Sequence, residues 1–525
     1  LEQVFPVRFE GREPDDLDGL DGILAIGNGD GGQSNAPAGG PDAMAQRCPC
    51  LVVFPQTAGA VGSGIVIELA ADTQLARPLR ERRLSEECGP AALSASPLGG
   101  DCVLACADGC PVWWRRPGRS NWAHYSAFCP EELGANEALR DQLRAGRFMG
   151  LVPLLHLLRH ICRELAWEER PLAAAFVVDD PNLHRSSYGH LGYRELIAHA
   201  DRHGYHLGLA TVPLDGWMSS RRASALVKSS PRALSLLMHG NDHVAGELGR
   251  LTDDRLAESV LAQALRRTLA LERRCGIAIE RVMVPPHEVC SATALSAMFR
   301  LGFEGACIGR RHPWRDSGSL SKFASAPLIK WHPTDLIDEG LPILPRYPID
   351  RSREDLVFRA LLGQPLIPFA HHWDFADGLD LLEQVASDIN SLGDVRWGSI
   401  GSIARNCFFT RRTGQTLHVQ MHSRRVVVDI PQGVCAVQVS APSLTADGPQ
   451  RHLAYGEARV ALANVEGRWM SDALPVTPAT PIELALTPKR PLDPATVPNP
   501  PRTPWPIVRR LLVEGRDRSR PLLGR

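Results

Sequence analysis

The sequence predicts an α/β protein in three parts: a distorted (β/α) barrel at residues 169–408, an α/β domain before it and a β-sandwich after it. The chain has 525 residues, more than one hydrophobic core usually organises, because domains settle at roughly 100–200 residues. Within 169–408, apolar strand-like runs alternate with amphipathic helical stretches, the pattern of parallel strands joined by helices. In 409–490 the helical periodicity disappears and short apolar runs follow at close intervals, which predicts the sandwich.

Charge and hydropathy exclude two classes of partner. The 58 Lys and Arg residues nearly balance the 59 Asp and Glu residues, so the basic surface of a nucleic-acid-binding protein is not expected. No apolar run approaches the roughly 18 residues that a membrane-spanning helix needs. The first residues lack a positive region followed by an apolar one, which predicts a cytoplasmic location without a secretory signal. The sequence leaves the oligomeric state open.

Residues 1–168 form the first predicted domain. Apolar strands are expected at 22–26, 50–55, 101–107 and 111–116, followed by a helix within 136–164. The unit loosely resembles flavodoxin-like or glutamine-amidotransferase-like domains, but it has no cysteine nucleophile in a G-x-C-x-G turn. We expect this domain to be non-catalytic.

The barrel is predicted from six buried strand-like runs and the helices between them. The runs cover 173–180, 205–213, 232–240, 282–286, 306–310 and 365–372. The most regular helical patterns are 193–204 and 251–276. Catalytic groups of α/β barrels lie at the carboxyl ends of the strands. Polar residues that follow these runs are therefore the candidates for function.

Two adjacent carboxylates end the first run. Asp179 and Asp180 follow a buried apolar stretch, and successive side chains of a strand point in opposite directions. One carboxylate can therefore bind a metal while the other takes a separate position. Burying two charges side by side is costly unless a cation compensates them. A turn cap before Pro181 is the structural alternative.

Two histidines four residues apart follow the third run. In one helical turn, the spacing of His239 and His243 would place both imidazoles on one face, roughly 5–6 Å apart at Cβ. Two His and one Asp leave an open position for water, as a catalytic metal site requires. Zinc is the favoured ion for such mixed nitrogen and oxygen ligands, and Co, Ni or Fe would also fit. Among 18 histidines this spacing can also arise by chance.

At this point the chain resembles the polysaccharide deacetylases, the NodB-homology or carbohydrate esterase family 4 group. The resemblance rests on the order of strand-Asp-Asp, H-x3-H, a Pro-Pro loop and a strand ending in His, and it covers about 171–406. It implies that Asp179 is the general base. It also implies that Asp180, His239 and His243 hold one divalent metal ion.

The resemblance is partial at the Pro-Pro loop. The R-P-P-Y-G sequence of the family corresponds to residues 284–288. Val284 stands where the family has an Arg that orients the base, so that role is vacant or filled elsewhere. His287 stands where the family has a Tyr whose backbone N–H helps to hold the oxyanion, and it is a candidate for substrate binding.

The late strand offers two candidates for the general acid of the family. His371 and His372 are adjacent, so only one is expected to face the site. The sequence leaves this choice open, with Asp374 as a partner that could orient either ring.

The sequence thus predicts a metal-dependent hydrolase that removes acetyl groups from an N- or O-acetylated sugar or polysaccharide. Loop residues Arg185, Tyr188 and Trp373 are further candidates for substrate contact. Two alternatives stay open: an amidohydrolase for a small non-sugar substrate, and a non-catalytic carbohydrate-binding protein on the same fold. The Pro- and Arg-rich residues 491–525 are expected to form a solvated tail.

Overall fold

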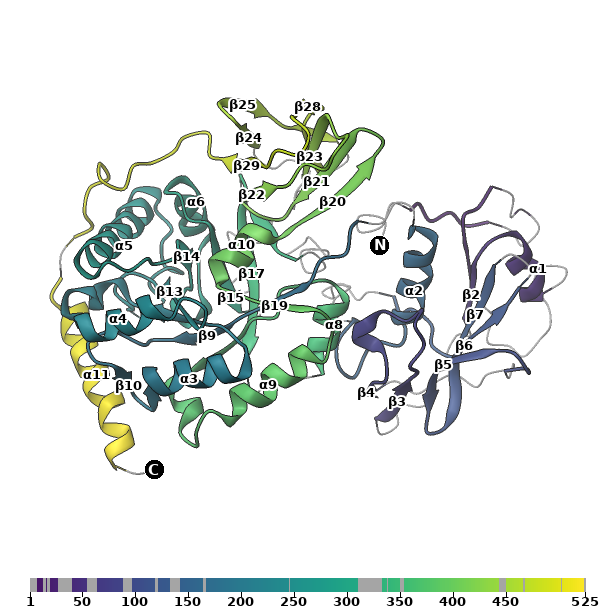
Figure 1. Ribbon diagram of the computed structural model, residues 1–525, viewed down its shortest axis with the longest axis horizontal. Helices are drawn as coiled ribbons and strands as arrows, with labels where there is room; N and C mark the ends of the chain where they lie inside the picture. The colour runs from purple at the N-terminus through teal and green to yellow at the C-terminus, as the bar shows by residue number, and fades with distance from the viewer. Residues whose placement is uncertain are drawn as a thin grey trace. The chain divides into compact units, whose positions relative to one another are not determined.

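The computed structural model describes residues 7–12, 16, 19–26, 40–53, 64–87, 97–118, 121–132, 142–163, 167–244, 246–309, 333–337, 339–349, 354–442, 450–465, 468–501 and 503–523. The chain divides into two compact units, drawn in Figure 1. The first comprises Leu1–Trp167 and Ser352–Leu362, and the second comprises Glu168–Arg351 and Gly363–Arg525.

The first unit is built on a seven-stranded sheet of order β1-β2-β7-β6-β5-β3-β4. Its strands are β1 (Ile23–Ile26), β2 (Cys50–Val53), β3 (Ile65–Leu69), β4 (Arg83–Glu86), β5 (Cys102–Ala107), β6 (Cys110–Pro117) and β7 (Trp122–Ser126). Alternate residues of β2 point to opposite faces: Cys50 packs with helix α1 (Gly40–Arg47), and Leu51 packs with α2 (Val152–Ile161). The 3-10 helix η1 (Arg77–Leu79) and α8 (Asp355–Leu361) pack against each other in the same unit.

This sheet is mixed, whereas a flavodoxin-like sheet is parallel. Strands β1, β2 and β7 are parallel, and the remaining strands pair antiparallel. The antiparallel pairing of β5 and β6 follows from the turn that joins them. Its two-residue turn is Asp108-Gly109, both at positive φ, and such turns connect antiparallel strands.

The second unit contains a closed barrel of seven parallel strands, which confirms the predicted barrel. The strands run in the order β15-β14-β13-β12-β9-β18-β17, and β15 pairs with β17 to close the ring. Their bounds are β9 (Phe176–Asp179), β12 (Leu207–Thr211), β13 (Leu234–Met238), β14 (Val282–Met283), β15 (Gly305–Gly309), β17 (Leu341–Pro348) and β18 (Pro368–His371). Strand β16 (Asp335–Ile337) adds antiparallel to β17.

Helices surround the barrel in Figure 1. They are α3 (Tyr193–His203), α4 (Arg221–Ser229), α5 (Asp254–Cys275), α6 (Ala292–Arg300), α9 (Asp380–Asn390) and α10 (Ile400–Asn406). The core joins barrel residues such as Val177, Leu237 and Cys307 to Ile400 and Ile403 of α10. This packing leaves the carboxyl ends of the strands for polar side chains.

Short strand pairs and two further sheets complete the second unit. The pairs are β8 (Leu172–Ala174) with β19 (Val395–Trp397), and β10 (Ser187–Tyr188) with β11 (Leu191–Gly192). One sheet contains β20 (Phe408–Thr413), β21 (Thr416–Met421), β23 (Ala436–Pro442), β26 (Ala463–Val465), β27 (Arg468–Met470) and β28 (Leu474–Pro475). The other contains β22 (Arg425–Val428), β24 (His452–Tyr455), β25 (Ala458–Ala461) and β29 (Ile482–Thr487). The packing of these sheets as a sandwich stays a prediction.

The solvated tail predicted for residues 491–525 is wrong for its second half. Residues Trp505–Leu523 form helix α11, which lies beside β10 in Figure 1. Arg510 and Asp517 are 4% and 1% exposed, and Arg518 donates to the Ser187 carbonyl of β10. Three of the charges that suggested a solvated segment, Arg509, Arg510 and Arg518, instead contact residues of the barrel or of its loops. Among the described helices, none combines the length and the apolarity needed to cross a membrane.

Candidate metal centre

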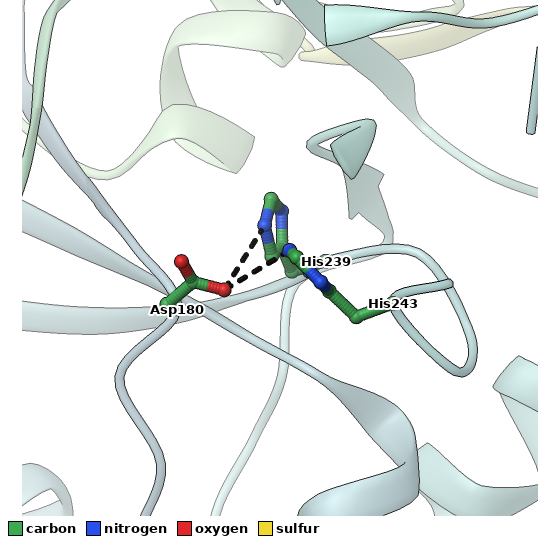
Figure 2. Close-up of side chains that lie close together, drawn as sticks. All are labelled: Asp180, His239 and His243. Atoms are coloured by element: carbon green, nitrogen blue, oxygen red, sulfur yellow. Dashed lines mark ion pairs between the residues drawn. The ribbon is translucent and has the colours of Figure 1, made fainter. Parts of the chain in front are cut away.

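Three predicted ligands meet at the carboxyl end of the barrel. Asp180 follows β9, and His239 and His243 follow β13. Figure 2 shows one carboxylate oxygen of Asp180 facing both imidazoles, with Oδ1 3.0 Å from Nε2 of His243 and 3.7 Å from Nε2 of His239. Two ligand atoms of a tetrahedral zinc site lie roughly 3.3 Å apart when each bond is about 2.0–2.1 Å. The three side chains are therefore spaced to hold one ion.

The hydrogen bonding of these side chains also fits a cation. Within the described residues, the buried Oδ1 of Asp180 has no donor aligned for a hydrogen bond. Nδ1 of His239 donates to the carbonyl oxygen of Val284 over 2.9 Å, because a carbonyl can only accept. This fixes the tautomer and leaves Nε2 unprotonated for a metal. Burial lowers the pKa of His239 to about 4, so the ring is neutral near neutral pH.

The charge of Asp180 is maintained despite its burial. Burial is the largest influence and raises its pKa, but the close approach of His243 and the charges of His239 and Arg510 together hold the pKa well below its usual range. Asp180 is therefore a carboxylate, the form that binds metals.

A loop, and not the expected helical turn, brings His239 and His243 together. Their ring centroids lie 4.9 Å apart, and His243 has a φ of 55°. Asp180, His287 and Glu288 also have positive φ. A non-glycine residue in this region costs free energy that the surrounding structure must offset, and such residues gather at functional sites. Four of them within this one site support a functional role for it.

Asp179 pairs with an arginine that the sequence analysis did not identify. Both oxygens of Asp179 accept from Arg346 of β17, at 2.7 and 2.9 Å, and both side chains are buried. Burial raises the pKa of Asp179, but the charges of Arg346 and His239 outweigh this and lower it overall. Arg346 thus brings to Asp179, from another strand, a cation that Val284 cannot provide. A charged residue inside the apolar run of β17 was the available signal.

The structure separates the two candidates for the general acid. His371 is paired with Asp179 in the register of β18 and β9, and its charge influences the pKa of both Asp179 and His287 after the larger effect of burial. Its ring accepts the backbone N–H of Asp374, whose carboxylate accepts the backbone N–H of His371 over 2.7 Å. His371 therefore lies toward the metal centre.

His372 points into a different environment. It is fully buried, with Nε2 3.8 Å from Oδ1 of Asp517 on α11, and it packs edge-on against the ring of Tyr188. A side chain on Gly189 would lie 2.2 Å from Nδ1 of His372, so the glycine permits this close packing. His372 thus takes part in docking α11.

The predicted substrate contacts differ in exposure. His287 is exposed beside His243, with ring centroids 5.2 Å apart, and Arg185 is exposed on the loop after β9. Trp373 is 41% exposed and stacks on His371 at 4.2 Å. Tyr188 is fully buried and donates to Oδ2 of Asp517 over 2.8 Å, so its hydroxyl is not presented to a substrate.

Helix α11 brings further charges to this end of the barrel. Arg510 forms two hydrogen bonds with Asp215 of the 3-10 helix η4 (Pro213–Met218). Arg509 donates to the carbonyl oxygen of His243. His184 lies 2.7 Å from the carboxylate of Glu514. The last helix therefore forms part of the rim of the metal centre.

Comparison with known proteins identifies similar folds only among solved structures. No protein-family pattern and no curated protein matches the chain. The structure is similar to that of Agd3, described as a novel carbohydrate deacetylase, with 10% identity over 92% of this chain and 93% of that one and a TM-score of 0.47. It is also similar to a family 4 carbohydrate esterase from Streptomyces lividans, with 13% identity and a TM-score of 0.27. This match covers 45% of this chain and 94% of the esterase chain. A polysaccharide deacetylase from Bacillus cereus matches with 10% identity and a TM-score of 0.24, over 44% of this chain and 92% of the deacetylase chain.

At such low identities, the site has to be interpreted from its own residues. Seven parallel strands close the ring, Asp179 and Asp180 end β9, and His239 and His243 follow β13. The ring is therefore a (β/α) barrel. This confirms the fold that the resemblance implied for residues 171–406, and it leaves the roles of the individual residues as predictions.

Proposed function

We propose that this protein is a metal-dependent deacetylase that hydrolyses the acetyl group of an N- or O-acetylated sugar or polysaccharide. The observation that carries this proposal is the convergence of Asp180, His239 and His243 beside a buried Asp179–Arg346 pair. Such a site has three ligands for an ion and a separate carboxylate within it. Structural metal sites are instead closed by four protein ligands.

Asp180, His239 and His243 would hold the ion. When bound, a divalent metal lowers the pKa of a water ligand from 15.7 toward roughly 7 and polarises a carbonyl oxygen. Zinc suits these ligands, and Co, Ni or Fe are alternatives.

Asp179 is suited to the role of general base. The two hydrogen bonds from Arg346 fix its carboxylate and keep it charged, so it can accept a proton from the attacking water. His371 is suited to the role of general acid. In its protonated form the ring can donate a proton to the leaving group and return to the neutral imidazole.

Two features favour an acetylated sugar over the alternative functions. Position 284 lacks the Arg of the family, but Arg346 supplies a cation to Asp179, which favours a catalytic protein over a non-catalytic one. Trp373 presents an exposed aromatic ring, stacked on His371, on which the apolar face of a sugar can pack. A small non-sugar amide would not need this platform.

Metal content and acetate release test the proposal together. Wild-type protein should bind zinc and release acetate from a panel of N- and O-acetylated sugars, and a chelator should abolish the release. Asp180→Asn should lose the activity and the tightly bound ion. Asp254→Asn, the same chemical change at an exposed position on α5, should retain both. Acetate release that persists unchanged in the chelated protein would contradict the proposal.

A further inference from the structure

Helix α11 has an unusual distribution of polarity. Its charged residues Arg510 and Asp517 are buried, whereas Leu511 and Leu512 are 49% and 66% exposed. Most helices at a protein surface bury the apolar side. Burying charges is costly unless each one is paired. The contacts that offset this cost in α11 lie around the metal centre.

Arg510 is held so that one of its nitrogens faces that centre. Nε donates to Oδ1 of Asp215 over 3.1 Å, and NH2 donates to Oδ2 of the same carboxylate. NH1 is buried and, within the described residues, has no hydrogen-bond acceptor. It lies 3.7 Å from Oδ1 of Asp180, the oxygen that also faces His239 and His243.

A buried nitrogen with two unused N–H groups is costly, because its lost hydration is not replaced. The fork of hydrogen bonds to Asp215 keeps NH1 at the rim of the metal site and prevents the guanidinium from turning toward solvent. A ligand with an anionic oxygen would satisfy NH1 at this position.

We propose that α11 completes the active centre and that NH1 of Arg510 contacts the oxygen that becomes negatively charged when the acetyl group is attacked, and afterwards a carboxylate oxygen of the acetate product. This inference rests on the proposed deacetylase function. In the reaction, the oxygen of water bonds to the acetyl carbon and the bond from that carbon to the sugar nitrogen or oxygen breaks. One proton passes to Asp179 and one passes from His371 to the leaving group. Arg510 donates a hydrogen bond and transfers no proton.

Acetate binding and turnover in Arg510→Gln test this contact. The protein is loaded with one equivalent of Co²⁺, and acetate binding is followed by the change in the visible spectrum. We expect the variant to retain the ion, to bind acetate roughly 10- to 100-fold more weakly and to lose about 10²- to 10³-fold in kcat. Leu512→Gln, an exposed position on the same helix, should behave like wild type.

A second variant tests whether the lost activity comes from the missing guanidinium or from a misfolded protein. In Arg510→Ala, millimolar guanidinium should restore part of kcat, whereas the same ion should not restore Asp179→Asn. Arg510→Gln with acetate affinity and kcat within twofold of Leu512→Gln would overturn the inference, and so would a rise in kcat, which would make α11 a barrier to substrate. Wild-type protein that neither binds Co²⁺ nor releases acetate would overturn the proposed function and this inference with it.

An independent cluster of side chains lies on the outside of the barrel. His199 and His203 stand one turn apart on α3, and Glu383 faces them from α9. Their potential ligand atoms all lie within 4.8 Å of one another, and the two ring centroids are 4.3 Å apart. Nδ1 of His199 is 2.7 Å from the hydroxyl of Tyr205, which orients the ring and leaves Nε2 for a ligand role.

From this geometry we infer a second site for a divalent transition metal such as Zn²⁺, Ni²⁺ or Co²⁺, which would join α3 to α9. Two imidazoles at i, i+4 and one carboxylate are a ligand set for such ions. The two histidines are partly exposed and Glu383 is exposed, which predicts weaker binding than at the buried centre.

Calorimetric titration with Zn²⁺ distinguishes the two sites. Wild-type protein should bind two ions, and either Asp180→Asn or His203→Ala should bind one. The combined variant should bind none, and His418→Ala, on strand β21, should bind two. An unchanged number of bound ions in His203→Ala would overturn this second inference without affecting the buried centre.

Discussion

Two neighbouring aspartates have different environments because Asp179 ends strand β9, whereas Asp180 follows the strand with a positive φ that turns the chain. Asp179 lies against Arg346, and Asp180 lies against His239 and His243. A single dipeptide thus supplies one carboxylate to Arg346 and the other to the candidate metal centre. The separation depends on Arg346. This side chain is fully buried, and its two terminal nitrogens donate hydrogen bonds to the two carboxylate oxygens of Asp179.

Loss of Arg346 should therefore affect stability as well as activity. Arg346→Met leaves the charge of Asp179 buried without its cation, and we expect the free energy of unfolding in urea to fall by about 3–5 kcal/mol. Asp179→Asn combined with Arg346→Gln should regain most of this stability and remain inactive. An Arg346→Met variant within about 1 kcal/mol of wild type would show that the pair is not the stabilising contact.

The two adjacent histidines should give different phenotypes. His371→Gln should lower kcat by about 10²- to 10⁴-fold with unchanged metal content, because it removes a proton donor and no ligand. His372→Gln should mainly weaken the packing of Tyr188 and Asp517 and so the stability of the fold. Rate constants and metal content of both purified variants provide the measurement. The reverse pattern would assign the acid role to His372.

Among the elements, α11 shows how a segment of ordinary polar composition becomes part of a site. Arg510, Glu514, Asp517 and Arg518 share one face at helical spacing, and each contacts a residue of the barrel or of its loops. The local sequence shows this helical periodicity, but the charges alone predict a helix face that is exposed to solvent. The partners that bury them, such as Asp215 and His184, come from distant parts of the chain.

The His184–Glu514 contact predicts a pH dependence for the docking of α11. Burial is the largest influence and lowers the pKa of His184, but the hydrogen bond with Glu514 and other contacts raise it overall above 6.5. The pKa of Glu514 is lowered to about 2, so this carboxylate stays charged. A histidine whose folded pKa is raised stabilises fully below its unfolded pKa, and this stability is lost as the pH rises through the folded value.

We therefore expect the loss of the His184–Glu514 contact to lower the free energy of unfolding by about 1 kcal/mol or less between pH 6 and pH 8.5. Urea titrations at both pH values measure the change. In Glu514→Gln the decrease should be smaller, because the neutral amide no longer favours the protonated ring. An equal or larger decrease in this variant would contradict the assignment.

On the scale of the whole molecule, the chain forms two compact units with separate hydrophobic cores. In the first unit, α1 and α2 pack on opposite faces of the sheet. In the second unit, the barrel carries the candidate metal centre. Helix α8 lies between two barrel strands in the sequence but belongs to the first unit. The first unit is therefore discontinuous in sequence.

Two units with separate cores should unfold in two thermal transitions. In scanning calorimetry, we expect added Zn²⁺ to raise the midpoint of only one of them, because a ligand stabilises the unit that binds it by about 2.7 kcal/mol at 100 times its dissociation constant. Asp180→Asn should reduce this shift. A single transition, or two that move together, would indicate that the units unfold cooperatively.

The sequence by itself determined the barrel and the end of it at which the candidate metal ligands lie. Apolar runs ending in Asp179–Asp180 and His239 are local patterns, and the carboxyl ends of parallel strands necessarily meet at one end of a barrel. The spacing of His239 and His243 pointed to two imidazoles that lie close together in the structure, although a loop and not a helical turn brings them together. The Asp-Gly turn before β6 marked an antiparallel hairpin that a parallel domain would not contain.

Only the tertiary structure decided which acidic and basic side chains form pairs. Arg346 meets Asp179 across 167 residues, and Arg510 meets Asp215 across 295. The choice of His371 over His372 likewise depends on α11, which occupies the side of the strand that His372 faces. Periodicity reports whether a side chain is buried, but the partner of a buried charge is set by long-range packing, because many cations of the chain could satisfy it equally well.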